Sequence, residues 1–403
     1  MYLLTLLKTN NLNPDDLFYK CNAINIAEKL NFTYLLPSKI SALSDYCYSY
    51  IEDYGFNSGP GLPIIWNFSW LLKSEWLANI AFPLLVSLIS ISYCLRILRL
   101  LKLENKSLIL SIYAGSPLVI WLSSHASTDI YSTFFSTIIF YELAKYFIHL
   151  NKSKVSKTST TFLKCNLLIV MMLLFRPMYF LTLFLSIPIS SITKNNLLKI
   201  TPFLITLICY LLFYRNYASS PLDYLFYNFS PPAPEGLYSF MKFYKLNFIN
   251  SFFSGELLNF LKSFFILIFS GILSTVYGLI SFSGLQISDT FQTFELKTTA
   301  AIYKSIFGLI FLLPGNIIIL TKGIFYTFKF LLKRKFNFIN TLEFSNSTKR
   351  DDILNMFYLI SFFYILTIVI YIPHMRYILP IQLFSIIASL NFYKITIKDK
   401  TTT

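Results

Sequence analysis

Long apolar blocks alternate with short polar segments along this chain of 403 residues. Most blocks are about 17–25 residues long, enough for a helix to cross the roughly 30 Å hydrocarbon core of a bilayer. A segment that crosses lipid must satisfy its own backbone hydrogen bonds, which a helix does alone. The pattern therefore predicts an all-α polytopic membrane protein that crosses the bilayer about ten times.

The predicted membrane helices share a predominantly apolar composition. They fall at residues 76–98, 107–123, 130–148, 162–192, 198–214, 253–286, 303–332, 353–372 and 377–390. The block 162–192 has double length and is expected to turn near Arg176-Pro177, while 253–286 is expected to leave and return on one face near Gly271. The first eight residues span only about 12 Å as a helix, so the first membrane helix is expected to be truncated.

Two long polar stretches separate these blocks, at residues 9–73 and 215–252. The second contains Pro231-Pro232-Ala233-Pro234, which cannot lie in an ordinary helix interior because proline lacks the backbone donor. Both stretches are expected to be loops with surface helices outside the hydrocarbon. The whole chain, 1–403, is expected to form a single membrane domain.

Composition supports the same class, since 55% of residues are apolar and 13% are charged, against about 25% charged in soluble domains. The formal charge of +15 comes from Lys and Arg in short segments between apolar blocks, so membrane orientation explains it and nucleic-acid binding is not expected. The basic clusters are Arg96, Arg99, Lys102 and Lys106; Lys145, Lys152, Lys154, Lys157 and Lys164; Lys329, Lys333, Arg334, Lys335, Lys349 and Arg350; and Lys394, Lys398 and Lys400.

These basic clusters are expected on the cytoplasmic side, because loops rich in Lys and Arg remain there. The loop 9–73 and the short turns 125–129 and 373–376 then lie outside. Among the five cysteines, only Cys21 and Cys47 fall in a polar segment where a disulfide is conceivable.

Charged residues at the membrane boundary are the main candidates for chemistry, because their burial is costly. Asp15, Asp16 and Asp129 follow or precede predicted helices on the outer side, and His374 and Arg376 lie in the last outer turn. Each has a simpler interpretation, as a helix cap for the acids and as an interfacial anchor for Arg376. On one face, however, carboxylates can deprotonate an acceptor while a guanidinium holds a phosphate bidentately.

The order of short motifs resembles the GT-C superfamily of membrane glycosyltransferases, particularly bacterial relatives of protein O-mannosyltransferase and of the aminoarabinose transferase that modifies lipid A. Pro14-Asp15-Asp16, with Tyr19 and Ala23, is similar to the family's acidic pair after its first helix, with Asp16 in place of glutamate. Ser58-Gly59-Pro60-Gly61-Leu62-Pro63 resembles the Pro-rich stretch that follows in those enzymes.

Three further motifs continue the resemblance in the same order. Gly115-Ser116-Pro117 is similar to the Ser-Pro start of the family's third helix, and Asp129 to the second acid, which opens the fourth. Arg376-Tyr377-Ile378-Leu379-Pro380 reproduces the Arg-Tyr-x-x-Pro found at the outer boundary of many members. The resemblance covers residues 10–220 and the last two predicted helices.

The resemblance implies a GT-C-like bundle in a cell membrane, expected to be a bacterial inner membrane, with an extracytoplasmic active site. It implies transfer of a sugar from a polyprenyl-phosphate carrier to a lipid or glycan acceptor, with Asp15 as base and Asp129 shaping the site. The implied residues are Asp15, Asp16 and Asp129 for catalysis, Arg376, His374, Arg176 and Tyr377 for the donor phosphate, and Tyr19, Pro60, Gly61 and Pro63 for the acceptor loop.

Two alternatives stay open at this stage. A polysaccharide polymerase of the O-antigen type also spans the membrane many times and has a large outer loop, but it would use arginines in outer loops, and Arg215 is a poor supply. A transporter would place carboxylates in mid-helix, and Glu142 is the main embedded acid, expected near the cytoplasmic end. The cofactor is unknown: carboxylates leave a divalent metal ion open, but no His/Cys spacing indicates zinc.

Overall fold

The computed structural model describes residues 14–29, 47, 60–123, 126–150, 158–176, 250–251, 254–266, 303, 306–332, 349–371 and 375–393. The described segments are helical, and no β-strand occurs among them, which confirms the predicted all-α class. His374 lies outside these ranges, and so does the second predicted outer loop, 215–252, apart from residues 250 and 251.

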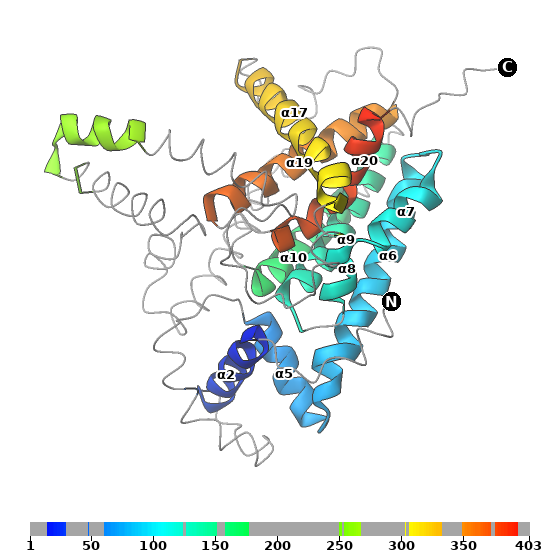
Figure 1. Cartoon of the computed structure of the whole chain (residues 1–403), viewed down its shortest axis with the longest axis vertical. Helices are drawn as coiled ribbons and strands as arrows, with labels where there is room; N and C mark the ends of the chain where they lie inside the picture. The colour runs from blue at the N-terminus through cyan, green and yellow to red at the C-terminus, as the bar shows by residue number, and fades with distance from the viewer. Residues whose placement is uncertain are drawn as a thin grey trace.

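The principal elements are α2 (Pro14–Lys29), α5 (Gly61–Leu71), the π-helix η2 (Leu77–Ala81), α6 (Phe82–Leu100), α7 (Lys106–Ala114), α8 (Pro117–Leu122), α9 (Thr128–Leu150), α10 (Thr158–Phe175), the π-helix η6 (Gly308–Leu312), α17 (Leu313–Leu332), α19 (Lys349–Tyr371), the 3-10 helix η7 (Met375–Ile381) and α20 (Gln382–Phe392). Figure 1 shows α2 and α5 beside each other at one end of the molecule.

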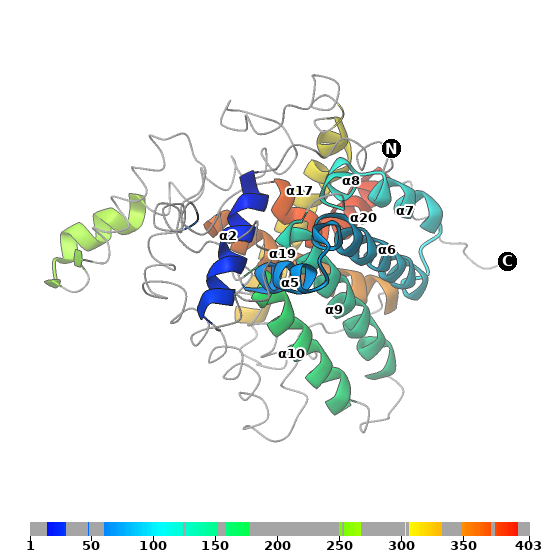
Figure 2. The same ribbon diagram turned by 90° about the horizontal axis from the view of Figure 1, so that it is seen from below.

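Helix α9 is at the centre of the bundle and packs against α6, α10 and η7 (Figures 1 and 2). Its Phe140 ring meets Phe357 of α19 at 5.2 Å and Phe384 of α20 at 4.4 Å between ring centroids. Edge-on and tilted aromatic contacts of this kind are favourable beyond the area they bury. The core is therefore built from segments more than 200 residues apart in sequence.

Two described helices are long and apolar enough to cross a membrane, Leu77–Leu100 with mean hydropathy 1.9 and Gly308–Thr327 with mean hydropathy 1.8. Only 28% and 39% of their most apolar windows are buried inside the protein. Shorter apolar helices are Lys164–Phe175, Leu257–Ile266, Ile353–Ile365 and Ile378–Phe392. The total of about ten crossings stays a prediction.

One predicted helix is wrong in its continuity, because residues 107–123 form α7 and α8 with a break at Gly115-Ser116. Pro117 has no backbone donor and occupies the first position of α8. The Ser116 hydroxyl accepts a hydrogen bond from the Val119 backbone N–H over 3.2 Å and so caps the new helix. Helix α10 ends at Phe175, next to the turn predicted near Arg176-Pro177; the second helix predicted within 162–192 lies outside the described residues.

Candidate functional site

Asp129 and Arg176 form a buried bidentate ion pair. Arg176 Nε donates to Asp129 Oδ1 over 2.7 Å, and Arg176 Nη2 donates to Asp129 Oδ2 over 2.9 Å. Asp129 lies in the first turn of α9, and Arg176 directly follows the last residue of α10. Paired parallel donors of this type give the strongest and most directional carboxylate contacts.

The first turn of α9 is capped by Ser127 and not by Asp129. The Ser127 hydroxyl accepts the Asp129 backbone N–H over 3.2 Å, as expected for a serine before a helix. The same hydroxyl donates to Asp129 Oδ2 over 3.2 Å, which helps to orient the carboxylate toward Arg176. The capping interpretation of Asp129 is therefore unnecessary, although a negative charge in this turn still suits the helix dipole.

The first acidic motif approaches the same place through Tyr19. The buried Tyr19 hydroxyl lies 3.3 Å from the Thr128 hydroxyl, within hydrogen-bond reach, and Thr128 immediately precedes Asp129. Asp16 lies about one turn before Tyr19 on α2, and Asp15 precedes Asp16. The side chains of Asp15 and Asp16 lie outside the described part of the structure, so their approach to Asp129 stays a prediction.

Helix α2 is held by contacts with α5, with Glu75 beyond the end of α5, and with Cys47. Asn67 Nδ2 donates to the Ala23 carbonyl over 3.0 Å, and Lys20 Nζ lies 2.7 Å from a Glu75 carboxylate oxygen. Cys21, two residues beyond Tyr19 along α2, forms a disulfide with Cys47. The pairing that the sequence left conceivable is present in the structure.

The Pro-rich motif packs over the end of α10. Pro60 immediately precedes α5, and Gly61 and Pro63 are buried in its first turn. A Cβ atom at Gly61 would come within 2.8 Å of the Phe175 ring, so glycine is needed for this approach. Phe175 in turn stacks on Tyr131 with ring centroids 4.8 Å apart. Gly61 thus lies against the residue that precedes Arg176.

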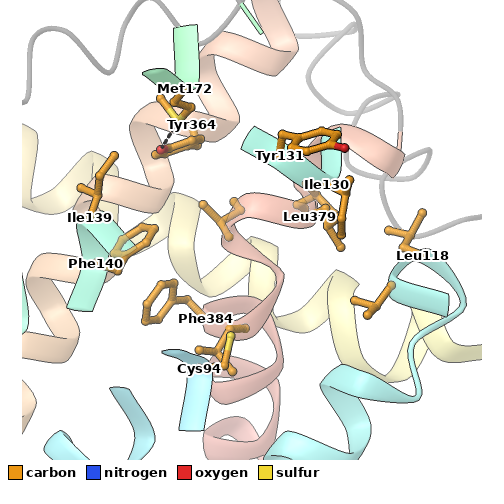
Figure 3. Close-up of a cluster of buried hydrophobic side chains, with 14 of the residues drawn as sticks. Cys94, Leu118, Ile130, Tyr131, Ile139, Phe140, Met172, Tyr364, Leu379 and Phe384 are labelled. Atoms are coloured by element: carbon orange, nitrogen blue, oxygen red, sulfur yellow. Dashed lines mark hydrogen bonds between the residues drawn. The ribbon is translucent and has the colours of Figure 1, made fainter. Parts of the chain in front are cut away.

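Helix η7 brings the last motif to α9. This segment carries Arg376 and Tyr377 and packs against α8, α9, α19 and α20. Leu379, three residues after Arg376, is buried, and Figure 3 shows it beside Ile130 and Tyr131. The backbone of Arg376 and Tyr377 therefore belongs to this packed turn, while their side chains lie outside the described structure.

A second ion-pair cluster joins α9 and α10 at a different level. Lys164 Nζ lies 2.6 Å from Glu142 Oε1, and Lys145 Nζ lies 3.6 Å from Glu142 Oε2. The two ion-pair levels are separated by 13 residues along α9 and 12 along α10, about 20 Å of helix in each case. The matching separations show that the two clusters support one antiparallel register.

Thr128, Tyr131 and Phe175 carry no motif of their own, so sequence reasoning missed them. The only sequence signal that could have indicated them is their position, because each lies within two residues of a candidate residue. The pairing of Arg176 with Asp129 was also missed, and a donor-phosphate role for Arg176 stays a prediction. Among the described residues, no group of three or more His, Cys, Asp or Glu is arranged to hold a metal ion.

Comparisons with protein families, with curated proteins and with solved structures found no match for this chain.

Proposed function

We propose that this protein is a multi-pass membrane glycosyltransferase, which moves one sugar from a polyprenyl-phosphate carrier to a lipid or glycan acceptor outside the cytoplasm. The observation that supports it best is the Tyr19–Thr128 contact, which joins the first acidic motif to the second across 109 residues. The Pro-rich motif reaches the same end of α9 through Phe175, which stacks on Tyr131, and η7 reaches it through Leu379 beside Ile130. Four motifs of the resemblance therefore meet in one place.

A membrane location is supported by the outward faces of the apolar helices. Leu85, Leu88, Ile317 and Phe325 are exposed large apolar side chains on the two helices long enough to span. Such surfaces are unfavourable in water but match hydrocarbon. We extend this to about ten spanning helices in the cell membrane.

The extracytoplasmic side is assigned from covalent chemistry and charge. The Cys21–Cys47 disulfide lies on the helix that contacts the N-terminal end of α9, and disulfides persist in oxidising compartments. Lys145 lies toward the opposite end of α9, where a basic segment is expected in the cytoplasm. The candidate site then faces outward.

The two acidic motifs have different roles in this proposal. Both Asp129 oxygens accept hydrogen bonds from Arg176, so Asp129 fixes the architecture of the site. Asp15, aided by Asp16, is the base that takes the proton from the acceptor hydroxyl. The acceptor oxygen bonds to the anomeric carbon as the bond from that carbon to the phosphate oxygen breaks, which inverts the centre.

The polyprenyl phosphate that leaves carries additional negative charge. Arg376 on η7 would hold it with two parallel donors, and Tyr377 and His374 are neighbouring candidates. The isoprenoid chain would lie between helices in the hydrocarbon. A divalent metal is not required by these steps.

Transfer by purified protein from a labelled lipid-linked sugar to a membrane acceptor tests the roles. Arg376→Lys should lower turnover about tenfold or more, because loss of a charge-assisted bond costs about 1.5–3 kcal/mol. Asp15→Asn should nearly abolish turnover but retain donor binding. Unmodified rates in both variants, compared at equal folded protein, would contradict the site assignment.

Sidedness is tested separately with an impermeant thiol reagent on intact cells. Lys73 and Lys102 are exposed and flank the candidate span Leu77–Leu100. In a background without other reactive cysteines, Lys73→Cys should be labelled and Lys102→Cys protected. The reverse pattern would place the candidate site in the cytoplasm and end the proposal.

A further inference from the structure

Tyr131 is a buried phenol whose hydroxyl has no hydrogen-bond partner within the described part of the chain. Only 4% of the residue is exposed. Buried tyrosine hydroxyls usually find a partner, because an unpaired one loses its interaction with water. Tyr364 is the matched contrast, since its equally buried hydroxyl meets Ser136 Oγ at 2.6 Å and Met172 Sδ at 3.1 Å.

The ring of Tyr131 is fixed by the candidate site itself. It stacks on Phe175 at 4.8 Å with an interplanar angle of 15°, and Phe175 fills the space left by Gly61. Phe175 also precedes Arg176, the partner of Asp129. The phenol is therefore held by the Pro-rich motif on one side and lies two residues from the second acid.

Other neighbours of Tyr131 come from α9 and η7. Figure 3 shows its ring beside Ile130 and Leu379, away from the Tyr364–Met172 contact. Leu379 lies one turn after Arg376, which the proposed function assigns to the donor phosphate. Tyr131 thus lies where α9 packs against η7, the segment that the proposed function assigns to the phosphate.

We propose that the Tyr131 hydroxyl donates a hydrogen bond to the phosphate of the polyprenyl-linked donor, as a second contact beside Arg376. This inference rests on the proposed function and names Tyr131 as a donor-binding residue. A phenol supplies one neutral donor, which suits an anionic oxygen without adding charge to the bilayer boundary. The unpaired hydroxyl is then satisfied when donor binds.

The test measures binding of polyprenyl phosphate without sugar to the purified full chain in detergent. Tyr131→Phe should bind it about tenfold more weakly than the unmodified protein, as expected for one lost bond to a charged group. Polyprenol, the same chain without phosphate, should show no difference between the two proteins. An equal loss with polyprenol would overturn the phosphate contact.

Tyr364→Phe provides the control, because it removes the same atom from a phenol with protein partners. Without ligand, it should lower the thermal midpoint, whereas Tyr131→Phe should not. Unchanged phosphate-lipid affinity in Tyr131→Phe, or a lowered ligand-free midpoint, would overturn the inference while the proposed function stood. If the unmodified protein did not bind polyprenyl phosphate, the proposed function would fail as well.

Discussion

The two ion-pair clusters between α9 and α10 differ in how their cations are exposed. At the candidate site, the Asp129 side chain is 0% exposed and that of Arg176 is 7% exposed. At the other level, the Glu142 side chain is 6% exposed, but Lys164 and Lys145 are 51% and 40% exposed. Both acids are buried, but of the three cations only Arg176 is buried as well.

This difference separates a pair that organises a site from a pair that supports packing. Burying both charges is costly, and the attraction repays it only with good geometry, which the bidentate Asp129–Arg176 contact has. The lysines at Glu142 keep their ammonium groups partly exposed, which avoids most of that cost. Arginine also offers a rigid fork where lysine offers a flexible point charge.

The two clusters should differ most in stability when one member of the buried pair is removed. Arg176→Met leaves Asp129 buried without its guanidinium, and we expect about 3–5 kcal/mol of lost stability. Unfolding of the purified protein in detergent measures this. The double variant Asp129→Leu/Arg176→Met should recover most of the loss, and a double variant as unstable as Arg176→Met would show that charge compensation is not the cause.

The disulfide provides a second test at the candidate site, because it constrains α2, the helix that contacts the end of α9 carrying Asp129. Cys21→Ser opens a link between residues separated by 26 positions, and we expect about 3 kcal/mol of lost stability. Thermal unfolding with and without reductant measures it. Cys47→Ser should match, and the double variant should be no worse than either; additive losses would mean that the cysteines act separately.

A substitution at Gly61 tests how closely α5 packs on Phe175, the residue before Arg176. Gly61→Ala places a methyl group within 2.8 Å of the Phe175 ring, so the ring must shift. We expect about 1–3 kcal/mol of overpacking and reduced sugar transfer, measured on the same preparation. Adding Phe175→Leu should relieve part of the loss, whereas unchanged stability in Gly61→Ala alone would contradict this packing.

The smallest effect on stability is expected at the Glu142 cluster, where both lysines are partly exposed. Lys164→Met removes a half-exposed cation from Glu142 while Lys145 remains nearby, so the loss should be at most about 1 kcal/mol. Unfolding under the conditions used for Arg176→Met allows direct comparison. Equal losses in the two variants would remove the distinction between the clusters.

The apolar pattern determined several helices closely, because a long run of apolar residues has few alternatives to a helix. Residues 130–148 were predicted, and α9 runs Thr128–Leu150; residues 353–372 were predicted, and α19 runs Lys349–Tyr371. The apolar pattern missed the break before Pro117 because the apolar run continues through it, whereas the resemblance implies a helix start at Ser116-Pro117, where α8 begins. Local backbone chemistry, and not hydropathy, decides that boundary.

For the candidate site, the sequence identified Asp129 and Arg176 as residue types suited to chemistry, since charge at an apolar boundary is visible in one dimension, and the resemblance singled out Tyr19. It did not determine their partners. The Arg176–Asp129 pair joins residues 47 apart, and the Tyr19–Thr128 contact joins residues 109 apart. Only the packing of α2, α5, α9 and α10 against one another brings those atoms within reach, because partner choice depends on the three-dimensional register of helices and not on the composition of any one of them.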